Sequence, residues 1–368
     1  MIYIGSKCVS HKEQVKNRLK VQMQLQKENK DDQISFNYLE IELRSQNLHD
    51  YQDLDDLLIP WFKNIGIRPN DFLIGIELPY YIYLNNERVP YDVHDCGLND
   101  KYSRQIVDAT LAQWNSFVDF LTDSTLNIHH VSVDCGDVRS NASYRMPDLD
   151  LEEQWKSARE GHLQLLAVMK KMNDCVLFEN IPAFRILQGY DRFGSYEMAT
   201  ALFGCFPDDF VNLTDITFDT AHGIISANVA TQILAGNEVV AEKFPGVAAS
   251  IKFRNLSIND IRLDAWYRKL AGHVPCIHVA DAIGFGGLGK EGVKLGTGQM
   301  DLEAVLQPFV LDATEIGSNN HAGSKCRSDL LLVSETVGAW HGLDYVQTGQ
   351  LMQQEERKIA KAVKILRR

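Results

Sequence analysis

The chain has 368 residues, of which 45% are hydrophobic and 23% are charged, a composition typical of a globular protein with a large core. Its 37 Lys and Arg against 49 Asp and Glu leave a formal charge of −12, which argues against non-specific binding to nucleic-acid phosphates or anionic lipid. No apolar run is long enough for a membrane span, and residues 1–14 lack the apolar core of a signal peptide.

Eight short apolar runs alternate with longer segments along the chain. They cover residues 3–6, 38–44, 72–80, 128–136, 175–182, 215–223, 275–282 and 330–338. Most stay apolar until they end in a polar residue, as strands do in a parallel sheet that helices cover on both faces. Helical periodicity follows the first four runs and the last, over residues 11–29, 54–66, 103–123, 151–172 and 355–366. The helices after runs five to seven are less clearly marked.

Eight strands alternating with helices predict an α/β protein with a (β/α)8 TIM barrel. The alternative is a doubly wound sheet, but the turn after the first run, SKCVSHKE, has no glycine cluster to bind a phosphate. We expect a single domain over residues 1–368. A long insertion is expected between strands six and seven, at 223–275, and a Gly-rich loop at 284–298 is expected to cover the site.

In a (β/α)8 barrel the catalytic side chains lie at the C-terminal ends of the strands. The runs end in polar and mostly acidic residues: Glu42, Glu77, Asp134, Glu179, Asp219 with His222, His278 with Asp281, and Glu335. So many carboxylates in one barrel mouth need a countercharge, and few basic residues stand near them in the sequence. We therefore predict one divalent cation as cofactor.

Four of these residues, one from each of strands five to eight, form the sharpest set. They are Glu179, Asp219, His278 and Glu335. Three carboxylates and one imidazole suit Mn²⁺, Mg²⁺, Co²⁺ or Zn²⁺, and they leave positions for two neighbouring oxygens of a substrate. Each residue alone could instead form a salt bridge, cap a helix or lie in the core, so the prediction depends on the set.

Phrases in the C-terminal half, residues 175–340, resemble the xylose-isomerase-like barrels, which include sugar isomerases, ketose 3-epimerases and apurinic endonucleases. LFENIP at 177–182 resembles the Glu-Asn motif of the fifth strand, and FDTAH at 218–222 resembles the Asp-x-x-His motif of the sixth. IHVADA at 277–282, followed by EGVKLGTGQMD at 291–301, is similar to the His-x-x-Asp motif and glycine loop of the seventh strand. SETVGAW at 334–340 is similar to the segment with the last-strand glutamate, whereas the N-terminal half matches only in architecture.

The resemblance implies that Glu179, Asp219, His278 and Glu335 bind one metal ion. It also implies that Glu179 and Glu335 act as the acid/base pair and that His222 contacts a substrate oxygen. The leading hypothesis is a metal-dependent isomerase or epimerase that moves a proton on a small polyhydroxy carbonyl compound through an enediolate.

Four more residues are candidates for substrate binding. Glu42 either lines the pocket or pairs with Arg44, and Asp134 ends the fourth run. Many epimerases carry an arginine in the loop after the seventh strand, and this arginine is absent here. Lys290 is among the nearest basic residues to that position in the sequence. Trp340 either stacks on a sugar face or packs at the rim.

Two other functions stay open: metal-dependent hydrolysis, including phosphodiester cleavage, and sugar binding without turnover. Hydrolysis of the apurinic-endonuclease type would need ligands for further ions, and no histidine lies between 279 and 320. GFGGLG at 284–289 formally fits a dinucleotide fingerprint, but further glycines follow where a helix should begin, so we interpret it as a lid loop. The seven scattered cysteines predict a reducing cytoplasm. The negative net charge and the lack of a long apolar run predict no nucleic-acid or membrane partner, and a homo-oligomer stays open.

Overall fold

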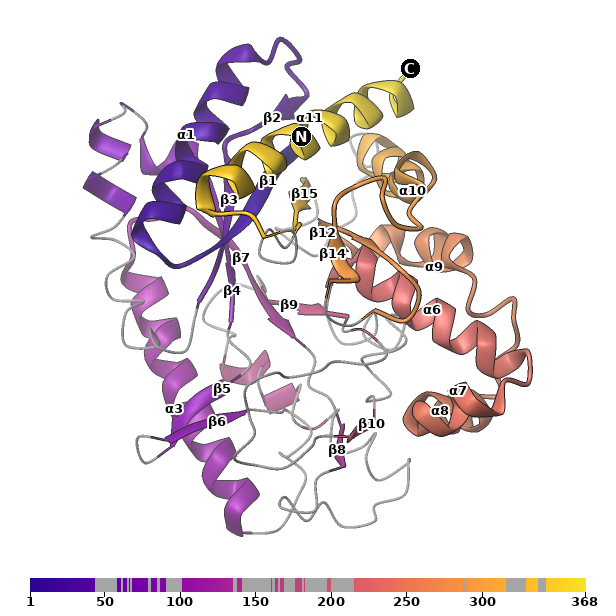
Figure 1. Cartoon of the computed structure of the whole chain (residues 1–368). Helices are drawn as coiled ribbons and strands as arrows, with labels where there is room; N and C mark the ends of the chain where they lie inside the picture. Colours follow the sequence, from indigo (N-terminus) through magenta and orange to yellow (C-terminus); the bar gives the residue numbers. More distant parts are fainter. Residues whose placement is uncertain are drawn as a thin grey trace.

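The computed structural model describes residues 1–43, 58–78 apart from 61, 65 and 67, 81–84, 87–90, 101–134, 138–140, 176–180, 197–199, 215–286, 289–315, 329–336 and 342–368, together with 160, 163–164, 166–168, 182. Eight parallel strands form its centre (Figure 1). They are β1 (Ile2–Val9), β3 (Tyr38–Glu42), β4 (Leu73–Glu77), β7 (Ile128–Asp134), β9 (Val176–Glu179), β11 (Ile216–Asp219), β12 (Cys276–Val279) and β15 (Leu330–Ser334).

These strands form a closed barrel in chain order. Each pairs with the next, and β15 pairs with β1 in parallel, with Ile2 opposite Leu330 and Ser6 opposite Ser334. All eight apolar runs of the sequence are barrel strands, so the prediction of a (β/α)8 barrel is confirmed. The short β2 (Ile34–Ser35) pairs with the start of β1. Three antiparallel pairs lie outside the barrel: β5 (Tyr81–Leu84) with β6 (Glu87–Pro90), β8 (Val138–Ser140) with β10 (Glu197–Ala199), and β13 (Asp281–Ala282) with β14 (Glu291–Val293).

Helices surround the barrel. They include α1 (Lys12–Glu28), α3 (Lys101–Asp123), α6 (Thr220–Leu234), α7 (Glu238–Lys243), α8 (Pro245–Arg254), α9 (Leu263–Leu270), α10 (Leu302–Glu315) and α11 (Tyr345–Leu366). The segments 11–29, 103–123 and 355–366 are helical as predicted, whereas most of 151–172 and part of 54–66 lie outside the described residues. Helices α6 to α9 occupy the connection between β11 and β12, and α1 packs against α11 (Figure 1).

Helix α11 begins earlier than predicted, at Tyr345. Asp344 and Gln347 form a capping box there, in which the Asp344 side chain accepts hydrogen bonds from the first backbone N–H groups. The cap satisfies donors that would otherwise have no partner, so the helix starts in a polar stretch.

The barrel interior changes from apolar to polar along the strands. Tyr38, Leu177, Cys276, Leu331 and Val333 form a small apolar cluster inside the barrel. A Cβ at Gly5 or Gly75 would lie 2.5 Å from the Tyr38 side chain, so glycine at both positions makes room for this ring. Inward positions recur every second residue of a strand, and the next ones after this cluster carry polar groups. The apolar cluster therefore forms the floor beneath a polar site.

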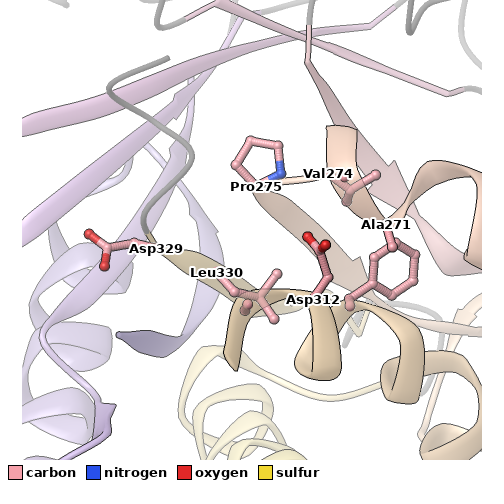
Figure 2. A pocket seen from close by; sticks show the side chains of 9 residues that line it. Ala271, Val274, Pro275, Asp312, Asp329 and Leu330 are labelled. Atoms are coloured by element: carbon pink, nitrogen blue, oxygen red, sulfur yellow. The ribbon is translucent and has the colours of Figure 1, made fainter. Parts of the chain in front are cut away.

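A small hollow lies at the other end of the barrel, before β12 and β15. It has a volume of about 30 Å³, and Val274, Pro275, Asp312, Asp329 and Leu330 are among its lining residues (Figure 2). Such a volume admits about one or two water molecules, so this hollow has no room for a sugar. Among the described residues, no helix is both long and apolar enough to cross a bilayer.

Candidate metal centre and active site

The C-terminal ends of four neighbouring strands bring the four predicted metal ligands together. Glu179 ends β9, Asp219 ends β11 opposite His278 of β12, and Glu335 directly follows β15. One ligand atom from each of the four lies within 4.8 Å of the others. Three of them are buried, and only Glu335 is partly exposed. The four side chains that the ends of the predicted strands single out therefore lie together in the folded barrel.

His278 lies between carboxylates on both sides of its ring. Its Nδ1 is 2.8 Å from Glu335 Oε2 and 3.2 Å from Glu179 Oε1, and its Nε2 is 2.6 Å from Glu40 Oε1. Burial alone would lower the pKa of His278, but the Glu179, Glu40 and Glu335 carboxylates outweigh burial and hold this pKa well above its usual range. The Nδ1 atom therefore faces the other candidate ligands, while Nε2 faces Glu40.

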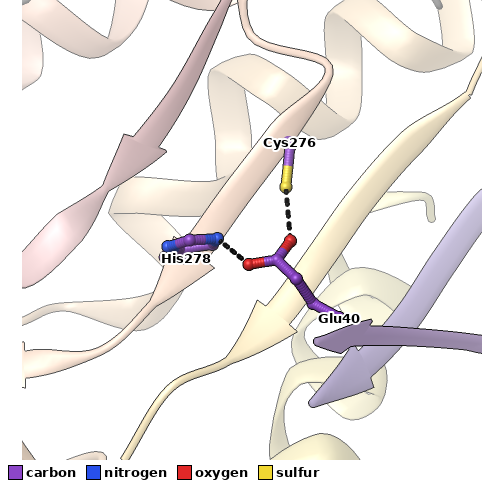
Figure 3. Close-up of side chains that lie close together, drawn as sticks. All are labelled: Glu40, Cys276 and His278. Carbon is purple, nitrogen blue, oxygen red and sulfur yellow. Dashed lines mark hydrogen bonds and ion pairs between the residues drawn. The ribbon is translucent and has the colours of Figure 1, made fainter. Parts of the chain in front are cut away.

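Glu40 is fully buried and lies between His278 and Cys276 inside the barrel (Figure 3). Its Oε2 accepts a hydrogen bond of 2.7 Å from the Tyr38 hydroxyl, lies 3.1 Å from His130 Nε2 and is 3.9 Å from Cys276 Sγ. Burial opposes its ionisation, but His278 and His130 hold the pKa of Glu40 well below its usual range. A carboxylate behind a ligand histidine fixes the orientation of the ring. Glu40 is not among the predicted site residues, although it lies two residues before Glu42 and so shares its inward face.

The chemistry of the cluster fits a divalent cation. Glu179 Oε2 is buried, and no group in the described part of the chain donates a hydrogen bond to it. Burial raises the pKa of Asp219 to about 8, with His222 opposing the shift and Glu335 and Glu179 adding to it. Carboxylates gathered in this way repel one another unless a cation lies between them. Oxygen and imidazole donors are the ligands that Mn²⁺, Mg²⁺, Co²⁺ and Zn²⁺ accept.

Lys7, near the end of β1, adds a positive charge to the barrel mouth. Its Nζ lies 2.5 Å from Glu335 Oε1 and also contacts Glu77 Oε2. Burial raises the pKa of Glu77 well above its usual range even though Lys7 opposes this shift. Few basic residues stand near the carboxylates in the sequence, and Lys7 comes close to two of them only in space. Lys7 directly follows the first apolar run, but its contact with Glu335 depends on the closure of the barrel.

His222 connects the cluster to the β13–β14 hairpin. The Asp219 carboxylate caps α6 by accepting a 2.7 Å hydrogen bond from the His222 backbone N–H. The ring lies 2.6 Å from the Asn180 carbonyl oxygen through Nδ1 and 3.0 Å from Glu291 Oε1 through Nε2. Burial would lower the pKa of His222, but Asp219 and Glu291 raise it well above its usual range. Both ring nitrogens contact protein atoms, and a substrate contact of His222 stays a prediction.

Asp281 holds the Gly-rich loop against the end of β12. Its Oδ2 accepts hydrogen bonds from the backbone N–H groups of Gly296 and Gly298, and its Oδ1 accepts from those of Ala282 and Met300. A Cβ at Gly298 would lie 2.2 Å from Asp281 Oδ1, so only glycine allows this close approach. A strand, β14, follows the first glycines where a dinucleotide fold would begin a helix.

The remaining candidate residues are placed as follows. Glu42 ends β3 and is half-buried, and Asp134 ends β7. Lys290 is exposed on the β13–β14 hairpin. Trp340 and Arg44, the possible partner of Glu42, lie outside the described residues. Glu291, which the sequence analysis did not single out, reaches His222 from the same hairpin.

Of known protein families, curated proteins and solved structures, only solved structures match this chain. No protein-family model matches the sequence, and neither does any curated protein. Among solved structures, a D-allulose 3-epimerase from Methylomonas sp. superimposes with a TM-score of 0.51 at 14% identity over 98% of both chains. A protein assigned as a sugar phosphate isomerase/epimerase from Anabaena variabilis has a TM-score of 0.51 at 12% identity, over 98% of this chain and 99% of that one.

A xylose isomerase domain protein from Alicyclobacillus acidocaldarius is also similar, with a TM-score of 0.49 at 11% identity over 98% of this chain and 99% of that one. The chain shares the (β/α)8-barrel fold of the two structures with TM-scores of 0.51. The D-allulose 3-epimerase covers almost the whole length of the chain. The shared fold thus includes the N-terminal half of the chain, where the sequence shows only the architecture.

Proposed function

We propose that this protein is a divalent-metal-dependent isomerase or epimerase of a sugar or sugar derivative. The convergence of Glu179, Asp219, His278 and Glu335 at the C-terminal mouth of the barrel carries the proposal. Solved structures that share the fold include a D-allulose 3-epimerase, which supports a small polyhydroxy carbonyl compound as the class of substrate. We place this activity in the cytoplasm, in a monomer or homo-oligomer that needs neither a membrane nor a nucleic acid.

In this proposal, three carboxylates and the Nδ1 atom of His278 hold one ion, which is Mn²⁺, Mg²⁺, Co²⁺ or Zn²⁺. A divalent ion there supplies Lewis acidity that polarises a substrate carbonyl and acidifies the neighbouring C–H bond. Glu40 keeps His278 oriented through its contact with Nε2. The pKa of Asp219, raised to about 8 by burial, falls when a cation neutralises its neighbours.

The two glutamates of the set divide the proton transfer. Glu179 comes from β9 and Glu335 from the end of β15, with β11 and β12 between them. Side chains from these separated strands reach a central substrate from different sides, so one takes the proton and the other returns one. Return to the opposite face of the same carbon is epimerisation, and return to the neighbouring carbon of the enediolate is isomerisation. His222, with Glu42, Asp134, Lys290 and Trp340, is proposed to contact substrate oxygens or the sugar face.

The test combines metal content with isotope exchange. The purified chain is loaded with Mn²⁺, Mg²⁺, Co²⁺ or Zn²⁺, and bound metal is counted by elemental analysis. It is then incubated in D₂O with a panel of free and phosphorylated ketoses and aldoses. We expect one ion per chain and deuterium at the carbon next to the substrate carbonyl in the product. Two or three ions with phosphodiester cleavage would favour the hydrolase, and sugar binding without metal or exchange would favour a binding barrel.

A further inference from the structure

The two oxygens of Glu335 face different charged groups. Oε2 lies 2.8 Å from His278 Nδ1, the atom that faces the candidate metal ligands, and Oε1 lies 2.5 Å from Lys7 Nζ. The Glu335 side chain is 18% exposed, whereas the other carboxylates of the set are buried. Packing therefore holds Glu335 less tightly than its partners, and its charged neighbours contribute more to its orientation.

Lys7 is itself held in place from behind. Its side chain is 9% exposed, and its ammonium group also contacts Glu77 Oε2 of β4, a side chain that is fully buried. Lys7 lies opposite Glu40 in the pairing of β1 with β3, and Glu77 ends the next strand in the barrel. Charge-assisted contacts strengthen when water is excluded, so an ammonium group that contacts the buried Glu77 and the partly exposed Glu335 has little freedom to move. The row Glu77–Lys7–Glu335 thus crosses the mouth of the barrel.

From these contacts we infer that Lys7 is a positioning residue, which binds one oxygen of Glu335 and leaves only the other to the metal ion. The inference rests on the metal centre proposed above. A carboxylate can bind a cation through one oxygen or through both. Because Lys7 holds Oε1, Glu335 is restricted to one oxygen, and a coordination position stays open for a substrate oxygen. The ammonium charge also repels the ion, so Lys7 weakens metal binding while it favours turnover.

A positioning role and a purely structural role for Lys7 predict opposite changes in metal affinity when Lys7 is replaced. If Lys7 only held the mouth together, its loss would weaken metal binding and stability in parallel. If Lys7 positions Glu335, its loss tightens metal binding, because a repelling charge is gone and Glu335 can use both oxygens. Turnover falls at the same time, because the position for the substrate oxygen is filled.

The experiment uses Co²⁺ as the probe, with the full chain. Lys7→Met keeps the length of the side chain and removes its charge. Lys7→Met combined with Glu77→Gln removes the ammonium charge and leaves no buried carboxyl group of Glu77 without its partner. We expect Co²⁺ to bind both variants at least about threefold more tightly than the wild type. The visible absorption of bound Co²⁺ should weaken as its coordination number rises, and turnover should fall at least about tenfold.

Lys16→Met is the matched control, because Lys16 on α1 is 32% exposed and pairs with Glu13 outside the barrel. It should leave Co²⁺ affinity, the absorption spectrum and turnover unchanged. Unchanged or weaker Co²⁺ binding by the folded double variant, with the spectrum of the wild type, would overturn the inference. A wild type that binds no Co²⁺, or binds it independently of Glu335→Gln, would instead refute the proposed metal centre and the inference with it.

Discussion

Two sets of buried carboxylates near the ends of β12 and β15 differ in what surrounds their oxygens. In the first set, Asp281 accepts hydrogen bonds from four backbone N–H groups, two of which, those of Gly296 and Gly298, belong to the Gly-rich loop. Glu355 of α11 likewise accepts hydrogen bonds from the Leu295 backbone N–H, at 2.9 Å, and from the Ser334 and Thr336 hydroxyls, at 3.0 and 2.5 Å. Donors from the fold satisfy these carboxylates, so burial is compatible with their charge.

In the second set, Glu179, Asp219 and Glu335 face one another across His278. Glu179 Oε2 receives no hydrogen bond from the described residues, and burial raises the pKa of Asp219 to about 8. Within the described part of the chain, Asp219 and Glu335 each have one donor, the His222 backbone N–H and Lys7, so this set is only partly satisfied. A buried carboxylate oxygen without a donor destabilises a fold, so the second set is less favourable for stability than the first. Burial and charge alone therefore do not distinguish the two sets, whereas the number of donors does.

The largest expected effect belongs to the second set. Glu179→Gln and Glu335→Gln keep the size of the side chain and remove its charge and its ability to take a proton. Each should lower turnover by about 10²- to 10⁴-fold at saturating metal, the usual range for general acid–base groups. Steady-state assays of isomerisation, with deuterium exchange at the substrate carbon, measure this loss.

Glu335→Gln should lower stability in the absence of metal, because Lys7 and His278 stabilise the charge that it removes. Glu179→Gln should not, because Glu179 Oε2 has no donor in the described part of the chain and faces other carboxylates. Chemical denaturation of the metal-free proteins checks this expectation. Full activity in either variant with metal bound would show that the chemistry lies elsewhere in the mouth. Asp134 and His222 would then be the next residues to test.

The second effect belongs to the first set and is a loss of stability. Asp281→Asn keeps one acceptor oxygen but turns an N–H₂ group toward backbone donors that Asp281 now satisfies. Losing two charge-assisted hydrogen bonds in a buried position should cost about 3 kcal/mol of unfolding free energy. Denaturation by urea measures this cost, and Co²⁺ binding should persist in the folded variant.

Asp301→Asn is the matched control. Asp301 is exposed and accepts a 3.1 Å hydrogen bond from the Ala304 backbone N–H at the start of α10. Asparagine caps a helix about as well as aspartate, so this variant should keep its stability within about 0.5 kcal/mol. If Asp281→Asn were equally mild, donor supply would not separate the two sets.

The fold and the candidate ligands could be predicted because both depend on local sequence. A barrel strand such as β9 is buried along its length, so it is a short apolar run in the sequence that ends in Glu179. The C-terminal ends of all barrel strands lie at the same mouth, so the fold alone predicts that these residues come together. The start of α11 was missed because its first turns are polar and the Asp344 cap decides where it begins.

Lys7, Glu40 and Glu291 could not be recognised because their roles depend on pairing between distant segments. Lys7 and Glu335 are 328 positions apart and become neighbours only when β15 closes the barrel onto β1. Glu40 reaches His278 across the barrel interior, a contact between residues that lie far apart in the sequence. Glu291 meets His222 because Asp281 folds the loop back. Hydrophobic patterns in one sequence predict elements, but they carry no information about such contacts.

A third prediction concerns the layer beneath the second set. Glu40→Gln removes the charge that faces His278 Nε2, so the ring is less firmly oriented and Nδ1 is a poorer ligand. Loss of such a supporting group typically weakens metal binding by about 10- to 100-fold. Tyr38→Phe removes one hydrogen bond to Glu40 and leaves its charge, so its effect should be smaller. Titration calorimetry with Mn²⁺ measures both, and equal affinity in Glu40→Gln and the wild type would contradict a supporting role.

The smallest expected effect concerns two neighbouring glutamates of α11. Among the described residues, Glu355 has three hydrogen-bond donors, and Glu356, the next residue, has fewer. Gln22 donates a 2.6 Å hydrogen bond to Glu356 Oε1. Burial raises the pKa of Glu356 from 4.5 to about 7; the neighbouring Glu355 adds to this shift, and Arg18 opposes it. A pKa raised by folding stabilises the protein fully below about pH 4.5, and this stability is lost as the pH rises through about 7.

Glu356→Gln should therefore gain stability only at the higher pH. The shift corresponds to about 3 kcal/mol, and the new amide N–H₂ group, buried without an assigned partner, removes about 1 to 2 kcal/mol of that gain. At pH 8 the variant should be about 1 to 2 kcal/mol more stable than the wild type, and at pH 5 it should be no more stable than the wild type. Urea unfolding at the two pH values measures the difference. A gain of the same size at both pH values would mean that packing, and not the buried charge, separates Glu356 from Glu355.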